Sequence, residues 1–117
     1  MVVKTDKTGQ TLIVKIEGDL DLNTAPAFRE AVEEKLAYYE NLKNIVVDFS
    51  EVTFLDSSGL GVLLGRFKHI TQIGGKMGLV GVKSQLIKVL ELSGILRIME
   101  LFDTKDEAIQ RLEGRKL

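Results

Sequence analysis

Short apolar segments alternate with longer amphipathic segments along most of this 117-residue chain, and that alternation limits the possible folds. Residues 45–49 and 77–82 are short apolar runs of the kind found in buried strands, and the helix-like segment 59–72 separates them. Parallel strands need a crossover of a dozen or more residues, usually a helix, and nearly all such crossovers are right-handed. The sequence therefore predicts an α/β fold with a central parallel βαβ unit.

The start of the chain predicts an antiparallel hairpin that adds to this sheet. In residues 11–17 apolar and polar residues alternate with a period of two, which only Ile13 breaks. The preceding segment MVVKT is short and β-prone, and the segment DKTG at 6–9 has the residue types of a turn. We therefore expect a small mixed sheet, antiparallel in the hairpin and parallel in the later strands.

Four segments with helical spacing of their apolar residues predict about four helices packed on the sheet. These segments are residues 23–39, 59–72, 85–93 and 105–112. Capping residues support their boundaries, namely Asn23 or Thr24 ahead of Pro26, Ser84, and Thr104 with Glu107 in a capping box. The segment LRIMELF at 96–102 is the candidate for a last strand. The chain length suits one domain that covers residues 1–117.

Composition excludes several classes of function. The chain has no cysteine and a single histidine, His69, so we expect no disulfide framework, no metal site and no cofactor of these types. The net charge is −1 at pH 7, without a basic stripe, so we expect no direct binding to nucleic acid. The N-terminal segment MVVKTDKTG lacks the apolar region of a signal peptide, and no stretch reaches the roughly 18 apolar residues of a membrane span. We therefore expect a cytoplasmic protein with no membrane contact.

The segment TFLDSSGLG at 53–61 joins an apolar strand to an apolar helix. In open α/β sheets the loops beyond the carboxyl ends of the strands form the usual recognition edge, and this segment lies there. One interpretation is purely structural: Ser57 or Ser58 caps the helix, and the glycines up to Gly65 allow close packing of the backbone.

Two enzymatic interpretations remain as alternatives. A serine nucleophile needs a base within hydrogen-bonding distance, but His69 lies twelve residues beyond Ser57, about 18 Å along a helix. A nucleotide site is suggested by Gly59-x-Gly61 at the start of a helix, although no G-K-[S/T] follows. The alternative function is thus a small nucleotide-binding module or hydrolase that uses the Ser57–Gly65 turn.

A fourth interpretation makes an exposed serine the acceptor of phosphate from another protein. The segment FLDSSGLGVLLGRFKHITQIGGKM, with GDLDLNTA upstream and LELSGILRI downstream, resembles the anti-sigma factor antagonist family of single-domain STAS proteins. The resemblance extends from about Val14 to Leu112, and D-S-[ST]-G-L-G at the head of this helix is the hallmark of the family.

The resemblance implies a regulatory protein, not an enzyme, that switches partners. The unphosphorylated antagonist binds an anti-sigma factor that is a serine kinase and so frees the sigma factor. Phosphorylation of the serine after the aspartate, here Ser57, ends this binding until a phosphoserine phosphatase restores it. Residues expected to contact the kinase are Asp21, Thr24, Asp56, Ser58, Gly59, Leu60 and Gly61. Sporulation members carry two histidines where this chain has Leu22 and Asn23.

Some of these positions also have ordinary structural interpretations. Asp21 is equally well read as a loop carboxylate near a helix start, and Asp56 as a residue that stabilises a turn. The acidic residues Glu30, Glu33 and Glu34 are most simply a solvated helix face.

Overall fold

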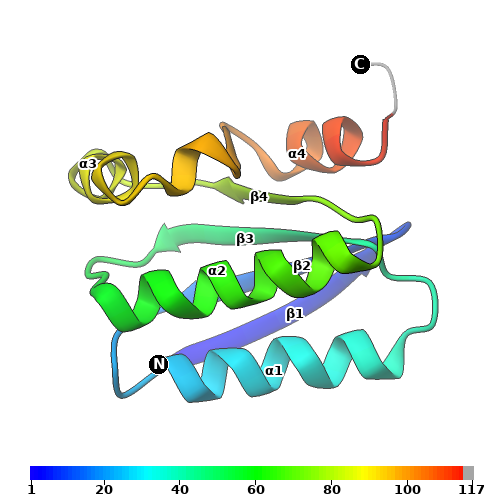
Figure 1. Ribbon diagram of the computed structural model, residues 1–117, viewed down its shortest axis with the longest axis horizontal. Helices are drawn as coiled ribbons and strands as arrows, with labels where there is room; N and C mark the ends of the chain where they lie inside the picture. Colours follow the sequence, from blue (N-terminus) through cyan, green and yellow to red (C-terminus); the bar gives the residue numbers. More distant parts are fainter. Residues whose placement is uncertain (115–117) are drawn as a thin grey trace.

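The computed structural model describes residues 1–114 and shows a mixed sheet flanked by helices (Figure 1). In chain order the elements are β1 (Val2–Thr8), β2 (Thr11–Glu17), α1 (Ala25–Tyr38), β3 (Asn44–Glu51), α2 (Ser57–Gln72), β4 (Met77–Val80), α3 (Ser84–Ser93), the 3-10 helix η1 (Ile95–Arg97), β5 (Glu100–Phe102) and α4 (Lys105–Leu112). The strand order is β1-β2-β3-β4-β5, antiparallel between β1 and β2 and parallel between the later neighbours. The predicted α/β class and mixed sheet are confirmed.

The N-terminal hairpin forms as predicted, but its turn lies further along the chain. Residues 6–8 pair with β2 in unbroken register, ending at Thr8 opposite Thr11, so only Gly9 and Gln10 make the turn. Gly9 has φ +58°, a left-handed conformation that glycine adopts without a steric penalty. The backbone pairing extended the strand over Asp6–Thr8 despite their turn-like composition.

The main core lies between the sheet and helices α1, α2 and α3. One set of strand side chains meets apolar residues of the three helices, and the core includes Leu12, Val14, Ile16, Ile45, Val47 and Leu79 from the sheet with Phe28, Val32, Leu63, Ile70, Leu86 and Leu90 from the helices. Burial of each such side chain contributes roughly 1.5–3 kcal/mol. The apolar faces of these three helices thus pack against one face of the sheet.

The opposite face of the sheet has a second, smaller core under α4. Ile13, Val46, Val80 and Phe102 pack there with Ala108, Ile109 and Leu112 of α4. Ile13, which breaks the alternation in β2, is only 8% exposed because α4 covers it. The predicted half-buried strand forms, and Ile13, the exception to its alternation, is explained because the second face of β2 is also covered at this position.

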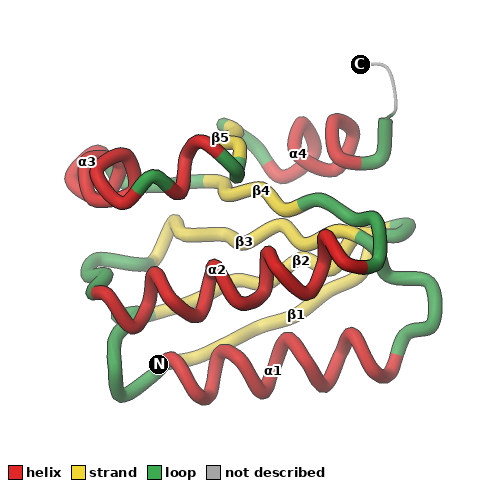
Figure 2. Tube along the Cα trace, viewed as in Figure 1, coloured by secondary structure: helices red, strands yellow, loops and turns green. Residues whose placement is uncertain are grey.

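Helix boundaries agree with the sequence prediction at some caps and differ at others. The hydroxyl of Thr104 accepts a hydrogen bond from the N–H of Glu107, which confirms that cap. Ser84 is instead the first residue of α3, after a Lys83 cap without a side-chain bond. The predicted last strand is shorter, because η1 takes up Ile95–Arg97 and leaves only β5 at the sheet edge (Figure 2).

Within residues 1–114, no helix has the length and apolar character needed to cross a membrane.

Candidate functional site

Two loops at the carboxyl ends of β2 and β3 form the site, and backbone hydrogen bonds hold them together. The N–H of Leu20 donates to the carbonyl of Phe54 at 3.0 Å, and Leu20 and Leu55 form a parallel bridge beyond the regular sheet. The hydroxyl of Thr53 donates to Asp19 Oδ1 at 3.1 Å. Figure 2 shows both loops at the same end of the sheet, each leading into a helix. The parallel strands thus bring the segments around Asp21 and Ser57 side by side.

Asp56 caps α2 and also connects the two loops. Its Oδ1 accepts a hydrogen bond from the N–H of Gly59 at 2.9 Å, and its Oδ2 accepts one from the N–H of Leu22 at 3.1 Å. The Gly59 hydrogen bond is the main cause that lowers the pKa of Asp56 below its usual value. The carboxylate is therefore ionised at neutral pH. The cap is Asp56 and not Ser57 or Ser58, which corrects the structural interpretation of the two serines.

The three glycines of this segment have different environments. A Cβ on Gly59 would overlap the carbonyl oxygen of Leu20 and lie 2.6 Å from Leu55 Cδ1, so only glycine fits there. A Cβ on Gly61 or Gly65 would meet nothing within 4 Å. Close packing therefore explains Gly59, as predicted. The same prediction was wrong for Gly61 and Gly65, which have no close neighbours.

The hydroxyl of Ser57 is accessible. Ser57 is the first residue of α2 and is exposed, while Ser58 behind it is half-buried. In the described part of the chain neither hydroxyl makes a hydrogen bond, because Asp56 already supplies the cap. A group on Ser57 would thus lie beside the first turn of α2, where backbone N–H groups favour negative charge.

Asp21 and Thr24 form a reciprocal pair that shapes the upstream loop. The N–H of Asp21 donates to the Thr24 hydroxyl at 2.9 Å, and the N–H groups of Asn23 and Thr24 donate to Asp21 Oδ1 at 2.9 and 3.0 Å. The Thr24 hydroxyl also lies 2.8 Å from the carbonyl of Asp19. Thr24 is the predicted N-cap residue of α1, but its side chain serves the loop and not the helix. The structural interpretation of Asp21 as a loop carboxylate is thus supported, whereas Thr24 does not provide the predicted side-chain cap.

Two exposed apolar residues near Ser57 were not predicted as contact residues. Leu22 in the upstream loop is 70% exposed, and Phe54 in the downstream loop is 51% exposed. Leu60, which was predicted, is partly buried against the core. The sequence contained a signal for these two residues, because large apolar side chains in short polar loops often mark a surface that binds a partner.

A partly buried ion pair connects α1 and α2 further along the two helices. Arg66 Nη1 lies 2.8 Å from Glu33 Oε2, and His69 Nδ1 lies 2.9 Å from Glu33 Oε1. Arg66 is only 8% exposed, and burial lowers its pKa more strongly than Glu33 raises it. Glu33 is thus not part of a solvated face, which corrects the prediction, whereas Glu30 and Glu34 are exposed. The imidazole of His69 is half-buried and pairs with Glu33.

Among residues 1–114, no three or more His, Cys, Asp or Glu side chains are grouped so that they could hold a metal ion.

The STAS domain family matches residues 2–108 of this chain. The chain belongs to the STAS domain family. An anti-sigma F factor antagonist of Paenibacillus polymyxa is 37% identical over 102 residues, which cover 87% of this chain and 86% of that protein. The predicted resemblance to the anti-sigma factor antagonists is therefore confirmed.

Solved structures of the antagonist SpoIIAA share this fold. Its unphosphorylated form superposes with a TM-score of 0.84 at 25% identity, covering 99% of this chain and 100% of that one. The phosphorylated form of the Bacillus SpoIIAA gives a TM-score of 0.72 at 26% identity, with 94% and 98% covered. The STAS fold of this chain is thus found in both forms of that protein.

Proposed function

We propose that this STAS protein is an anti-sigma factor antagonist that acts by partner switching. In its unphosphorylated form it binds an anti-sigma factor that is a serine kinase and so releases the sigma factor. Phosphorylation of Ser57 ends this binding, and a phosphoserine phosphatase restores it. The observation that carries the proposal is the exposed Ser57 hydroxyl, free of hydrogen bonds within residues 1–114, at the edge where the two loops meet.

The kinase is expected to dock on the surface around Ser57. Asp21 and Thr24 hold the upstream loop in the conformation that presents Leu22, while Asp56 and Gly59 hold the downstream loop against it. The remaining predicted contacts surround the acceptor, namely Ser58, Leu60 and Gly61. Apolar anchors beside a hydroxyl give the mixed character of a protein interface core.

Charge explains how one phosphate would switch binding without unfolding the antagonist. A phosphoserine at position 57 adds about −1.5 to −2 charges beside the positive end of α2, where negative charge stabilises a helix. The Asp56 carboxylate is ionised next to it. A kinase surface that fits a neutral hydroxyl then meets two neighbouring anions, and a penalty of about 3 kcal/mol already weakens binding roughly a hundredfold. The structure of phosphorylated SpoIIAA has the same fold, which supports the expectation that phosphorylation leaves the antagonist folded.

The test compares Ser57→Ala and Ser57→Asp with the parent protein, using Ser84→Asp as a control on an exposed serine of another helix. Calorimetric titration with the cognate kinase should give tight binding for the parent, Ser57→Ala and Ser84→Asp. Ser57→Asp should bind about a hundredfold more weakly while its circular dichroism stays that of the parent. Equal binding by Ser57→Asp would contradict the switch.

Intact mass measured after incubation with ATP distinguishes this proposal from an enzymatic one. The parent should gain one phosphate only when the kinase is present, and Ser57→Ala should gain none. Turnover of ATP by the isolated chain would instead support the nucleotide-binding or hydrolase alternative. We expect the switch to operate in the cytoplasm and without direct contact to nucleic acid.

A further inference from the structure

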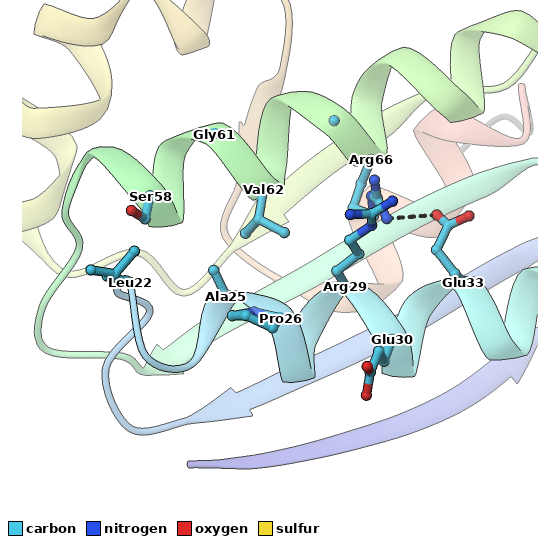
Figure 3. A pocket seen from close by; sticks show the side chains of 11 residues that line it. Leu22, Ala25, Pro26, Arg29, Glu30, Glu33, Ser58, Gly61, Val62 and Arg66 are labelled. Atoms are coloured by element: carbon cyan, nitrogen blue, oxygen red, sulfur yellow. Dashed lines mark hydrogen bonds and ion pairs between the residues drawn. The ribbon is translucent and has the colours of Figure 1, made fainter.

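A groove between α1 and α2 hollows the described surface, and we call it the α1/α2 groove. Its volume is about 830 Å³, within the range of small-molecule sites. It extends from Leu22 and Ser58 at one end to Glu33 and Arg66 at the other, as Figure 3 shows. Ala25, Pro26 and Val62 give it an apolar middle section.

Two glycines keep the groove open at a cost to the helix that carries them. Gly61 and Gly65 lie one turn apart in α2, and a Cβ atom at either position would meet nothing within 4 Å. Glycine inside a helix is less favourable than alanine by about 1 kcal/mol. Packing within the described chain does not require these glycines, so they are free to leave room for a group that binds in the groove, beside the kinase contact expected at Gly61.

The groove ends at two neighbouring guanidinium groups, the exposed Arg29 and the buried Arg66. Arg29 extends from α1 toward Arg66 of α2, and its positive charge contributes to lowering the pKa of Arg66. Arg66 is 8% exposed, has Glu33 as its ion-pair partner, and its Nε is buried without a hydrogen bond among residues 1–114. Glu33 also pairs with His69, and the carboxylate of Glu30 points away from Arg29 (Figure 3). Arg29 and Arg66 face each other here, and Glu33, which pairs with Arg66, is shared with His69, so this end of the groove favours an additional anion.

We propose that the α1/α2 groove binds a small organic oxyanion, namely a carboxylate or phosphate group attached to a compact apolar body. The oxyanion lies against Arg29 and Arg66, whose planar guanidinium groups match both kinds of anion. The apolar body lies along Val62 and Ala25 in the space that Gly61 and Gly65 leave free. One end of the groove, at Leu22, Ser58 and Gly61, belongs to the surface on which the kinase is proposed to dock, whereas the anion lies at the other end, at Arg29 and Arg66, and does not use the Ser57 hydroxyl.

The test is a titration of the 117-residue protein, followed by amide chemical shifts in nuclear magnetic resonance. The probes are phenyl phosphate, benzoate, inorganic phosphate and the neutral benzyl alcohol. Phenyl phosphate, benzoate or both should shift the amides of Gly61, Gly65 and Arg29 in a saturable way, and the two arms tell phosphate from carboxylate. Benzyl alcohol and inorganic phosphate should each bind at least tenfold more weakly, because benzyl alcohol lacks the anionic group and inorganic phosphate lacks the apolar body.

Two variants test separately how the positive charge of the groove and its free space contribute to binding. Arg29→Gln should weaken binding of the anionic probe about tenfold, and Gly65→Leu should abolish it by filling the groove while keeping the fold. Arg97→Gln, on an exposed arginine outside the groove, is the matched control and should bind like the parent. The inference is overturned if no saturable shifts appear at these amides, if benzyl alcohol binds as well as the anions, or if both groove variants bind like the parent.

Discussion

Asp56 and Gly59 fix the start of α2, and they act through opposite properties of their side chains. Asp56 offers two carboxylate oxygens, one to the first turn of its own helix and one to the upstream loop. Gly59 has no side chain, so the carbonyl of Leu20 can come close to the helix. Together they leave the hydroxyl of Ser57 unused by the fold. At this scale, the residues around Ser57 have structural roles and Ser57 itself has none.

The glycines of α2 give a prediction at the residue scale. Gly59→Ala should destabilise the protein by about 1–3 kcal/mol, because its methyl group overlaps Leu20 and Leu55 and the two loops must move apart. Gly61→Ala should instead stabilise the protein by up to ~1 kcal/mol, because alanine favours the helix and meets no obstacle. Urea unfolding followed by circular dichroism measures both. A Gly59→Ala protein as stable as the parent would contradict the close approach of the loops.

At the scale of elements, α1 and α2 lie side by side on one face of the sheet but are not packed together along their full length. The backbone of the two loops joins them at the Ser57 end, and Arg66 with Glu33 joins them further along. Between these connections lies the α1/α2 groove. The ion pair therefore connects the two helices at the end of the groove that is distant from Ser57.

This bridge gives a prediction about a single carboxylate. Glu33→Gln should destabilise the protein by roughly 1–3 kcal/mol, because the buried Arg66 guanidinium loses its charged partner. The effect should be below that of a fully buried pair, since the Glu33 side chain is 34% exposed. Glu34→Gln on the exposed face of α1 is the control and should change stability by less than about 0.5 kcal/mol. Equal thermal unfolding of the two variants would contradict a structural role for the pair.

At the scale of the whole molecule, the sheet separates two cores with different roles. The core on the α1, α2 and α3 side supports the candidate site, because α1 and α2 begin at the two joined loops. The core under α4 covers the other face and includes no residue of those loops. Mutations in the second core should therefore affect stability more than partner binding.

Ile109→Ala tests this separation. It removes a side chain that is 7% exposed and packed under α4, so we expect a loss of about 2–5 kcal/mol in unfolding free energy. The affinity for the cognate kinase, measured by calorimetry at a temperature where the variant is folded, should equal that of the parent. A large loss of affinity in a folded Ile109→Ala protein would show that the two faces are coupled.

The sequence predicted local features where neighbouring residues decide the structure. Periodicity located the four helices, and Thr104 showed its cap, because these signals act within one or two turns. Local signals failed where distant segments compete. Asp56 took the cap that the serines were expected to provide, and β2 pairing drew Asp6–Thr8 into a strand.

The sequence by itself determined the alternation of strands and helices, the α/β class, and the candidate serine at the end of a strand. Only the tertiary structure decided that Ile13 is buried under α4, that Glu33 pairs with Arg66, and that Gly61 and Gly65 face open space. The physical reason is that periodicity reports which faces of one element are apolar. What covers each face depends on contacts between residues that are tens of positions apart, such as the 33 positions between Glu33 and Arg66.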